Sequence, residues 1–235
     1  MKAVLALADG RVFEGKSFGA TGEATGEVVF NTAMTGYQEV LTDPSYKGQM
    51  VTMTYTQVGN TGINPEDIES KQLYLSGFIV KEYLDCHSNW RATMSLDAYL
   101  KENGVVGIQG LDTRALTRHL RDKGAQNGII STVDFDHESL VRKARAVPSM
   151  AGLDLASGVT CEKPYHWSEK LWELGTGYGE AAPGGVEVQG SGLRLRDQVQ
   201  HPPLPGLRRL RRDGGSRNLP GRGGPRHEAG RDFPQ

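Results

Sequence analysis

The sequence predicts a mixed α/β domain in which strands outnumber helices, followed by a disordered tail. Three features support this prediction. Short β-branched segments lie next to glycines, helical segments carry a capping residue and an apolar face, and the composition changes sharply near residue 180. The first two features describe a folded body, and the third marks its end.

Five segments of the body have strand character. The first, VLALADGRVFEGKSFGA (residues 4–20), contains two strand-like runs around Asp9-Gly10, a dipeptide that accepts the positive φ of a tight hairpin turn. The other four are rich in β-branched or aromatic residues and adjoin glycines; they are residues 26–36, 48–59, 77–83 and 105–110.

Three segments have helical signals. Ser95 can cap a short helix over residues 95–104, and Asp112 can cap a longer one over residues 111–124. A last helix is predicted over residues 136–147. Each of the three is followed by a residue that ends helices, either Gly or Pro.

The second helix carries Arg114, Arg118 and Arg121 on one stripe at helical spacing. Such a stripe could bind an anion or a partner, but an ordinary solvated helix face is the favoured interpretation. His119 lies near the apolar edge of this helix without an evident ligand partner, so we treat it as structural.

The net charge of −1 conceals two regions of opposite charge. Residues 1–182 contain 17 basic and 23 acidic residues, whereas residues 183–235 contain 10 basic residues, all Arg, and 5 acidic ones. An Arg/Gly-rich tail can bind nucleic acid by neutralising phosphates. The aromatic residues usual in such tails are missing, however, and the acidic residues dilute the charge, so the pattern disfavours nucleic-acid binding.

The two cysteines, Cys86 and Cys161, are too few for a disulfide framework and match no metal-ligand spacing. A buried or idle thiol is the favoured role for both. Cys86 precedes His87, but adjacent residues of an extended segment point to opposite faces, which disfavours a catalytic pair. The apolar N-terminal stretch is too short for a signal peptide and no segment reaches membrane-spanning length, so we expect a cytoplasmic protein.

Three long motifs occur in order along the body: GEVVFNTAMTGYQEVLTDPSYKGQMVTMTY, GLDTRALTRHLRDKGAQNG and MAGLDLASGVT. They closely resemble the N-terminal domain of the small subunit of glutamine-hydrolysing carbamoyl-phosphate synthase, and the likeness covers about residues 1–175. It implies a swivelling β/β/α domain over residues 1–150 and a connecting segment over residues 151–180. It also implies docking on the large subunit, which uses ATP and Mg²⁺ to make carbamoyl phosphate for arginine and pyrimidine biosynthesis. The alternative is a stand-alone interaction module.

In the resembled family a class I glutamine amidotransferase domain follows, in which a Cys, a His and an acidic residue release ammonia from glutamine. Neither Cys86 nor Cys161 has the Gly-flanked turn that this nucleophile needs. We therefore expect no catalytic residue, metal site or cofactor in this chain, and no glutaminase activity. Read one base out of step, the chain from Val188 onward permits a sequence that resembles the start of the missing domain. The tail, residues 181–235, is accordingly interpreted as a disordered frameshift product.

Ser45 is the one candidate binding residue. In the resembled family the Ser of the DPSY loop reaches the glutamine bound in the neighbouring domain, and here that residue is Ser45. A hydroxyl on a turn is rigidly placed and can donate or accept a hydrogen bond. From the residues alone an ordinary turn serine after Pro44 is favoured, and the resemblance reverses that preference. Without the second domain, Ser45 is expected to face solvent.

Overall fold

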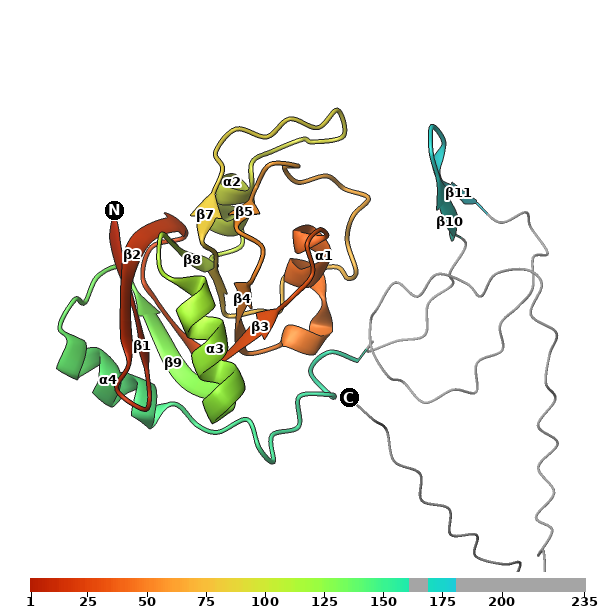
Figure 1. The fold of residues 1–235 in the computed structure, drawn as a ribbon. Coiled ribbons are helices and arrows are strands. Elements are labelled where there is room, and N and C mark those ends of the chain that lie inside the picture. The colour runs from red at the N-terminus through yellow and green to blue at the C-terminus, as the bar shows by residue number, and fades with distance from the viewer. Residues whose placement is uncertain (161–168, 181–235) are drawn as a thin grey trace, which may run out of the picture. The chain divides into compact units, whose positions relative to one another are not determined.

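The computed structural model describes residues 1–160 and 169–180 (Figure 1). The chain divides into two units, Met1–Pro202 and Pro203–Gln235, and every described residue belongs to the first unit. The predicted disordered tail, residues 181–235, and Cys161 lie outside the described residues. Within the described ranges, no helix has the length and apolar character needed to cross a membrane.

Seven strands form a closed barrel in the order β1-β2-β8-β6-β4-β3-β9. Their bounds are β1 Lys2–Leu7, β2 Val12–Gly19, β3 Glu23–Asn31, β4 Gln49–Met53, β6 Gly77–Ile79, β8 Val106–Gln109 and β9 Gln126–Ser131. Within this barrel β3, β4, β6 and β8 run parallel to one another, and the other pairs are antiparallel. Because parallel strands end at the same edge of a sheet, the loops that follow these four strands emerge at one end of the barrel.

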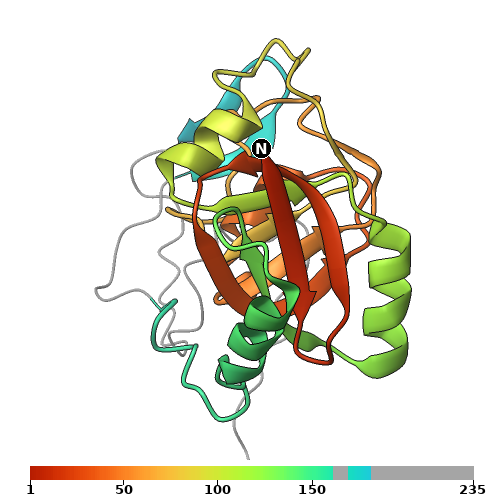
Figure 2. The same cartoon turned by 90° about the vertical axis from the view of Figure 1, so that its left-hand side faces the viewer.

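The remaining elements are short. Two small sheets pair β5 Gln57–Val58 with β7 Glu82–Tyr83, and β10 Glu169–Glu173 with β11 Gly177–Glu180. The helices are α1 Tyr37–Thr42, α2 Leu96–Glu102, α3 Thr113–Lys123 and α4 His137–Ala146, with a 3-10 turn, η1, at Pro44–Tyr46. Figure 2 shows α2, α3 and α4 at separate positions around the barrel.

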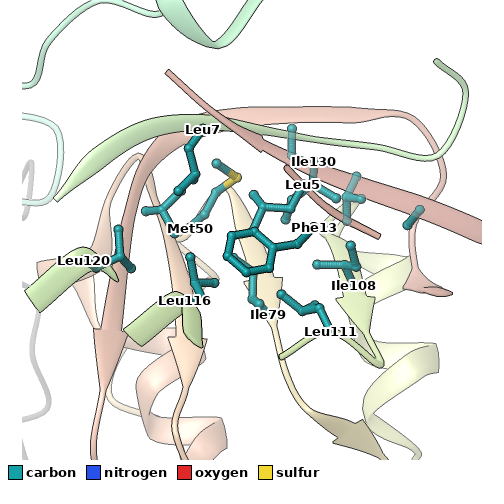
Figure 3. Close-up of a cluster of buried hydrophobic side chains, with 14 residues drawn as sticks. Leu5, Leu7, Phe13, Met50, Ile79, Ile108, Leu111, Leu116, Leu120 and Ile130 are labelled. Atoms are coloured by element: carbon teal, nitrogen blue, oxygen red, sulfur yellow. The ribbon is translucent and has the colours of Figure 1, made fainter. Parts of the chain in front are cut away.

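One apolar cluster receives side chains from every barrel strand and from α3 (Figure 3). Strand alternation sends Leu5 of β1 into this cluster and Val4 to the opposite face, where Leu140 of α4 covers it. Fully burying such a side chain stabilises the fold by about 1.5–3 kcal/mol. The cluster members that Figure 3 labels are Leu5, Leu7, Phe13, Met50, Ile79, Ile108, Leu111, Leu116, Leu120 and Ile130.

The predicted turn and helix caps are confirmed. Gly10 has φ 101° in the hairpin between β1 and β2, as the Asp-Gly dipeptide predicts. Ser95 Oγ accepts a hydrogen bond from the Ala98 N–H at 3.2 Å, and Asp112 Oδ1 accepts one from the Ala115 N–H at 2.9 Å. These bonds satisfy backbone donors that the first turn of a helix otherwise leaves unpaired.

Other boundaries differ from the prediction. Residues 77–83, predicted as one strand, are divided into β6, which lies in the barrel, and β7, which pairs with β5. The strand predicted over residues 26–36 begins earlier, at Glu23, and ends at Asn31. The structure also contains α1, β9 and the β10–β11 hairpin, none of which the sequence patterns indicated.

Candidate functional site: the Ser45 turn and the Arg91 cluster

Ser45 lies on a turn whose backbone is held by neighbouring side chains. Asp43, between α1 and η1, accepts a hydrogen bond at Oδ1 from the Ser45 N–H at 2.8 Å. The Tyr46 hydroxyl accepts a hydrogen bond from Asn31 Nδ2 at 2.9 Å, which fixes η1 against the end of β3. Pro44 is buried, whereas Ser45 is exposed. The turn therefore presents Ser45 to solvent on a constrained backbone.

The preceding helix, α1, is fixed near both of its ends. The Tyr37 hydroxyl donates to the Gly62 carbonyl at 2.7 Å. Thr42 Oγ1 accepts a hydrogen bond from the Glu69 N–H at 2.9 Å, and Leu41 is fully buried. A helix of six residues has little intrinsic stability. These contacts with the loop that follows β5 therefore determine where α1, and with it Ser45, is placed.

A partly buried polar network, which we call the Arg91 cluster, joins α1 to two loops. It consists of Gln38, Asn64, Glu66, Asp67 and Arg91. Gln38 Nε2 donates to the Asn64 carbonyl at 2.5 Å, and Gln38 Oε1 accepts from the Asn64 N–H at 3.0 Å. Arg91 Nη2 donates to Asn64 Oδ1 at 3.1 Å and forms an ion pair with Asp67. Arg91 Nε lies 3.7 Å from Glu66 Oε2.

The Arg91 cluster borders an open pocket of about 350 Å³. The guanidinium of Arg91 already faces two carboxylates, so it is compensated rather than available to an anionic ligand. Among residues 1–160 and 169–180, no group of three or more His, Cys, Asp or Glu side chains could hold a metal ion. The paired charges of Arg91 instead hold the carboxylates of Glu66 and Asp67 beside Asn64.

Glu39 also lines this pocket, and its ionisation is disfavoured there. Burial raises the pKa of the Glu39 carboxyl, and the nearby charges of Asp67 and Glu69 raise it further. A carboxyl whose pKa is higher in the folded state binds its proton more tightly there than in the unfolded state. The fold therefore loses stability as the pH rises through the pKa of Glu39.

Replacing Glu39 with Gln is expected to raise the melting temperature near neutral pH by up to about 2–4 °C. Below about pH 4 the gain should vanish, because Glu39 is then protonated in both states. Thermal unfolding of both proteins across this pH range measures the difference. The exposed Glu102→Gln change on α2 is the matched control, and an equal gain from both variants would contradict this account.

The arginine stripe and His119 occupy different settings. Arg114, Arg118 and Arg121 are exposed on α3, as both a solvated face and a binding surface require. His119 is not without partners: its Nε2 lies 2.6 Å from Asp9 Oδ2, and its Nδ1 lies 3.2 Å from Arg11 Nη1. Arginine can only donate, so Nδ1 accepts and the neutral ring donates from Nε2 to Asp9. His119 thus ties α3 to the β1–β2 hairpin, which is a structural role.

Cys86 is free and exposed, so it is not the buried thiol that the sequence allowed. The adjacent His87 is partly buried, and its Nδ1 is enclosed without a hydrogen bond. The two side chains therefore face different surroundings. Cys86 forms no hydrogen bond with a histidine in the part of the chain that the structure describes.

The barrel matches a known class of protein domain. Residues 5–130 match the family model for the carbamoyl-phosphate synthase small chain, CPSase domain. The small chain from Syntrophotalea carbinolica is 68% identical over 178 residues, which cover 76% of this chain and 47% of that protein. The small chain from Aquifex aeolicus is 56% identical over 176 residues, which cover 75% of this chain and 47% of that protein.

The chain therefore belongs to the carbamoyl-phosphate synthase small chain family, as its sequence motifs predicted. It spans about half the length of the curated relatives it matches. The Ser45 turn lies inside the matched range, and so does the whole Arg91 cluster. The sequence patterns did not identify the cluster. The polar, turn-forming NPED and WRA segments were its only signals.

Proposed function

We propose that this chain is the N-terminal part of a carbamoyl-phosphate synthase small chain and docks on the large subunit. There it would take part in glutamine-dependent synthesis of carbamoyl phosphate, with ATP and Mg²⁺ used by the large subunit, in the cytoplasmic arginine and pyrimidine pathways. The observation that carries the proposal is the match of residues 5–130 to the small-chain family. We also infer the swivelling β/β/α fold for the body.

Each remaining part of the chain has its own proposed role. Residues 151–180 would connect the body to the glutamine amidotransferase domain of the intact protein, and residues 181–235 would be the product of a shifted reading frame. The hydroxyl of Ser45 contacts the glutamine bound in that amidotransferase domain. Its exposure and the constrained turn at Asp43 support this role, because a contact between domains needs an accessible and rigidly placed group.

Exposed apolar side chains gather at one end of the barrel, and we call this set the loop-end surface. It consists of Met34, Tyr55 and Trp90, which are 74%, 41% and 79% exposed. Met34 and Tyr55 line one pocket, Trp90 lines a second, and Thr35 and Gly36 line both. Contiguous exposed apolar groups commonly mark a protein–protein contact surface.

The chain alone is expected to self-associate at micromolar concentration through the loop-end surface. Adding a carbamoyl-phosphate synthase large subunit, for example that of Syntrophotalea carbinolica, should draw it into a complex of defined mass. Light scattering coupled to size exclusion measures both states. A chain that stays monomeric and does not bind the large subunit would contradict both expectations.

Two serine substitutions test which surface mediates self-association. Trp90→Ser removes the most exposed member of the loop-end surface and should lower the self-associated fraction. Val133→Ser is the matched control, because Val133 is also exposed, at 64%, but lies after β9, outside the loop-end surface. Equal effects of the two changes would show that the association does not depend on the loop-end surface.

A further inference from the structure

The β10–β11 hairpin contacts the Arg91 cluster through three interactions. Trp172 Nε1 donates to Glu66 Oε2 at 2.7 Å, and the Tyr178 hydroxyl donates to the Glu66 carbonyl at 3.3 Å. The guanidinium of Arg91 lies 5.0 Å from the centroid of the Trp172 ring, within the range of a cation–π interaction. Trp172 and Tyr178 are cross-strand partners, so both contacts come from one rung of the hairpin.

The same cluster leads from the hairpin to the Ser45 turn. Arg91 bonds to Asn64, and Asn64 forms the paired hydrogen bonds with Gln38 of α1. Gln38 and Asn64 are only 4% and 3% exposed, so the loss of either partner would leave an unpaired buried group. Helix α1 ends at Asp43, whose carboxylate accepts the hydrogen bond from Ser45. The contacts are continuous from Trp172 to this turn.

Gly158, which precedes the hairpin in the sequence, lies close to Lys47, the residue that follows η1. A Cβ at Gly158 would lie 1.8 Å from Lys47 Nζ, so the Lys47 side chain lies directly against the backbone there. The hydrogen bonds from Ser157 lower the pKa of the Asp154 carboxyl, and the charge of Lys47 lowers it further. Val159, the residue after Gly158, is 8% exposed, so its side chain is covered.

We propose that residues 151–160 and the β10–β11 hairpin position the Ser45 turn, with Trp172 and Arg91 as the positioning residues. Contact with Lys47 on one side and with the Arg91 cluster on the other restrains α1 and η1 as one unit. This inference rests on the proposed function only in naming Ser45 as the group that is presented to glutamine. The restraint itself is a property of this chain.

Hydrogen exchange on the whole chain tests the proposal without glutamine or the large subunit. Trp172→Ala removes the hydrogen bond to Glu66 and the ring over Arg91. Exchange should rise about tenfold in residues 169–180 and also, by a smaller factor, in residues 37–47. Thr176→Ala is the matched control on the same hairpin, because Thr176 is exposed and does not line the pocket beside the Arg91 cluster. It should change neither region.

A conservative variant separates the two contacts of Trp172. Trp172→Phe keeps an aromatic ring over Arg91 and loses the N–H donor, so its exchange should fall between wild type and Trp172→Ala.

A rise confined to residues 169–180 in Trp172→Ala would overturn the positioning of Ser45. Equal exchange in Trp172→Ala and Thr176→Ala would overturn the hairpin contact itself. Unchanged exchange in β1 and β2 verifies that the barrel is intact. Failure of the chain to bind a large subunit would bear on the proposed function alone.

Discussion

The purified chain is expected to release no glutamate from glutamine above a buffer control. Glutamine hydrolysis by a class I amidotransferase needs a Cys nucleophile with a His base within hydrogen-bond reach. Cys86 is exposed and has no histidine partner among the described residues, and neither Cys86 nor Cys161 has the Gly-flanked turn of such a nucleophile. Loss of a nucleophile or its base lowers such a rate by at least about 100-fold. Turnover that survives repurification would contradict the proposal.

Restoring the reading frame provides the positive arm of this experiment. If residues 181–235 are out of frame, the nucleotide sequence across codons 175–190 contains the shift. A one-base change there should then yield a longer chain with the amidotransferase domain, and this longer chain should release glutamate. The same longer chain carrying Ser45→Ala should have a higher KM for glutamine, because Ser45 is proposed to contact glutamine and not to form the nucleophile. A restored frame without homology to an amidotransferase would contradict the frameshift.

Local chemistry made a large part of the fold predictable. The cap at Ser95, the cap at Asp112 and the Asp9-Gly10 turn depend on residues no more than a few positions apart, so the sequence contains the whole signal. The three helices predicted from such signals are present. The family motifs then placed the chain in the small-chain family, which the matched residues 5–130 confirm.

The elements that the sequence patterns missed depend on distant contacts. Strand β9 contains Gln126, Asn127 and Gly128, which have low strand propensity, and it is a strand because it pairs with both β1 and β3. Helix α1 is only six residues long and is held by a loop more than twenty residues away in sequence. Tertiary contacts decide these elements against weak local preferences.

The candidate site also has one part that the sequence predicts and one part that it does not. The location of Ser45 on an exposed turn could be predicted, because DPSY is a contiguous turn signal. The Arg91 cluster could not be predicted, because its hydrogen bonds join Gln38 to Asn64, Asn64 to Arg91, and Glu66 to a hairpin more than a hundred residues away. Single polar residues at such separations carry no periodic signal.

Gly26 of β3 lies close to the backbone that precedes β4, and its replacement by Ala is expected to lower stability strongly. A Cβ on Gly26 would lie 2.3 Å from the Gly48 carbonyl oxygen and 2.7 Å from Ser76 Oγ. The Gly48 oxygen belongs to the backbone that leads into β4, so it cannot rotate away as a side chain would. Strand β3 must therefore move away from β4, although the two pair over five residues, from Glu27 with Gln49 to Asn31 with Met53.

The closed barrel makes that movement costly. Strand β3 is also paired with β9, where Gly26 lies opposite Gly128, so a shift away from β4 disturbs both of its ladders. Overpacking a well-packed interior commonly costs 1–3 kcal/mol, and a clash with backbone on a strand paired on both sides should reach at least about 3 kcal/mol. This corresponds to a fall of roughly 6–12 °C in melting temperature for a domain of this size.

Thermal and denaturant unfolding measure the loss. Gly179→Ala is the control, because a Cβ there meets only Lys170 Cδ, at 3.8 Å, and it should leave the main transition in place. If Gly26→Ala has the same melting temperature as the wild type, β3 and β4 are not packed as closely as this barrel requires.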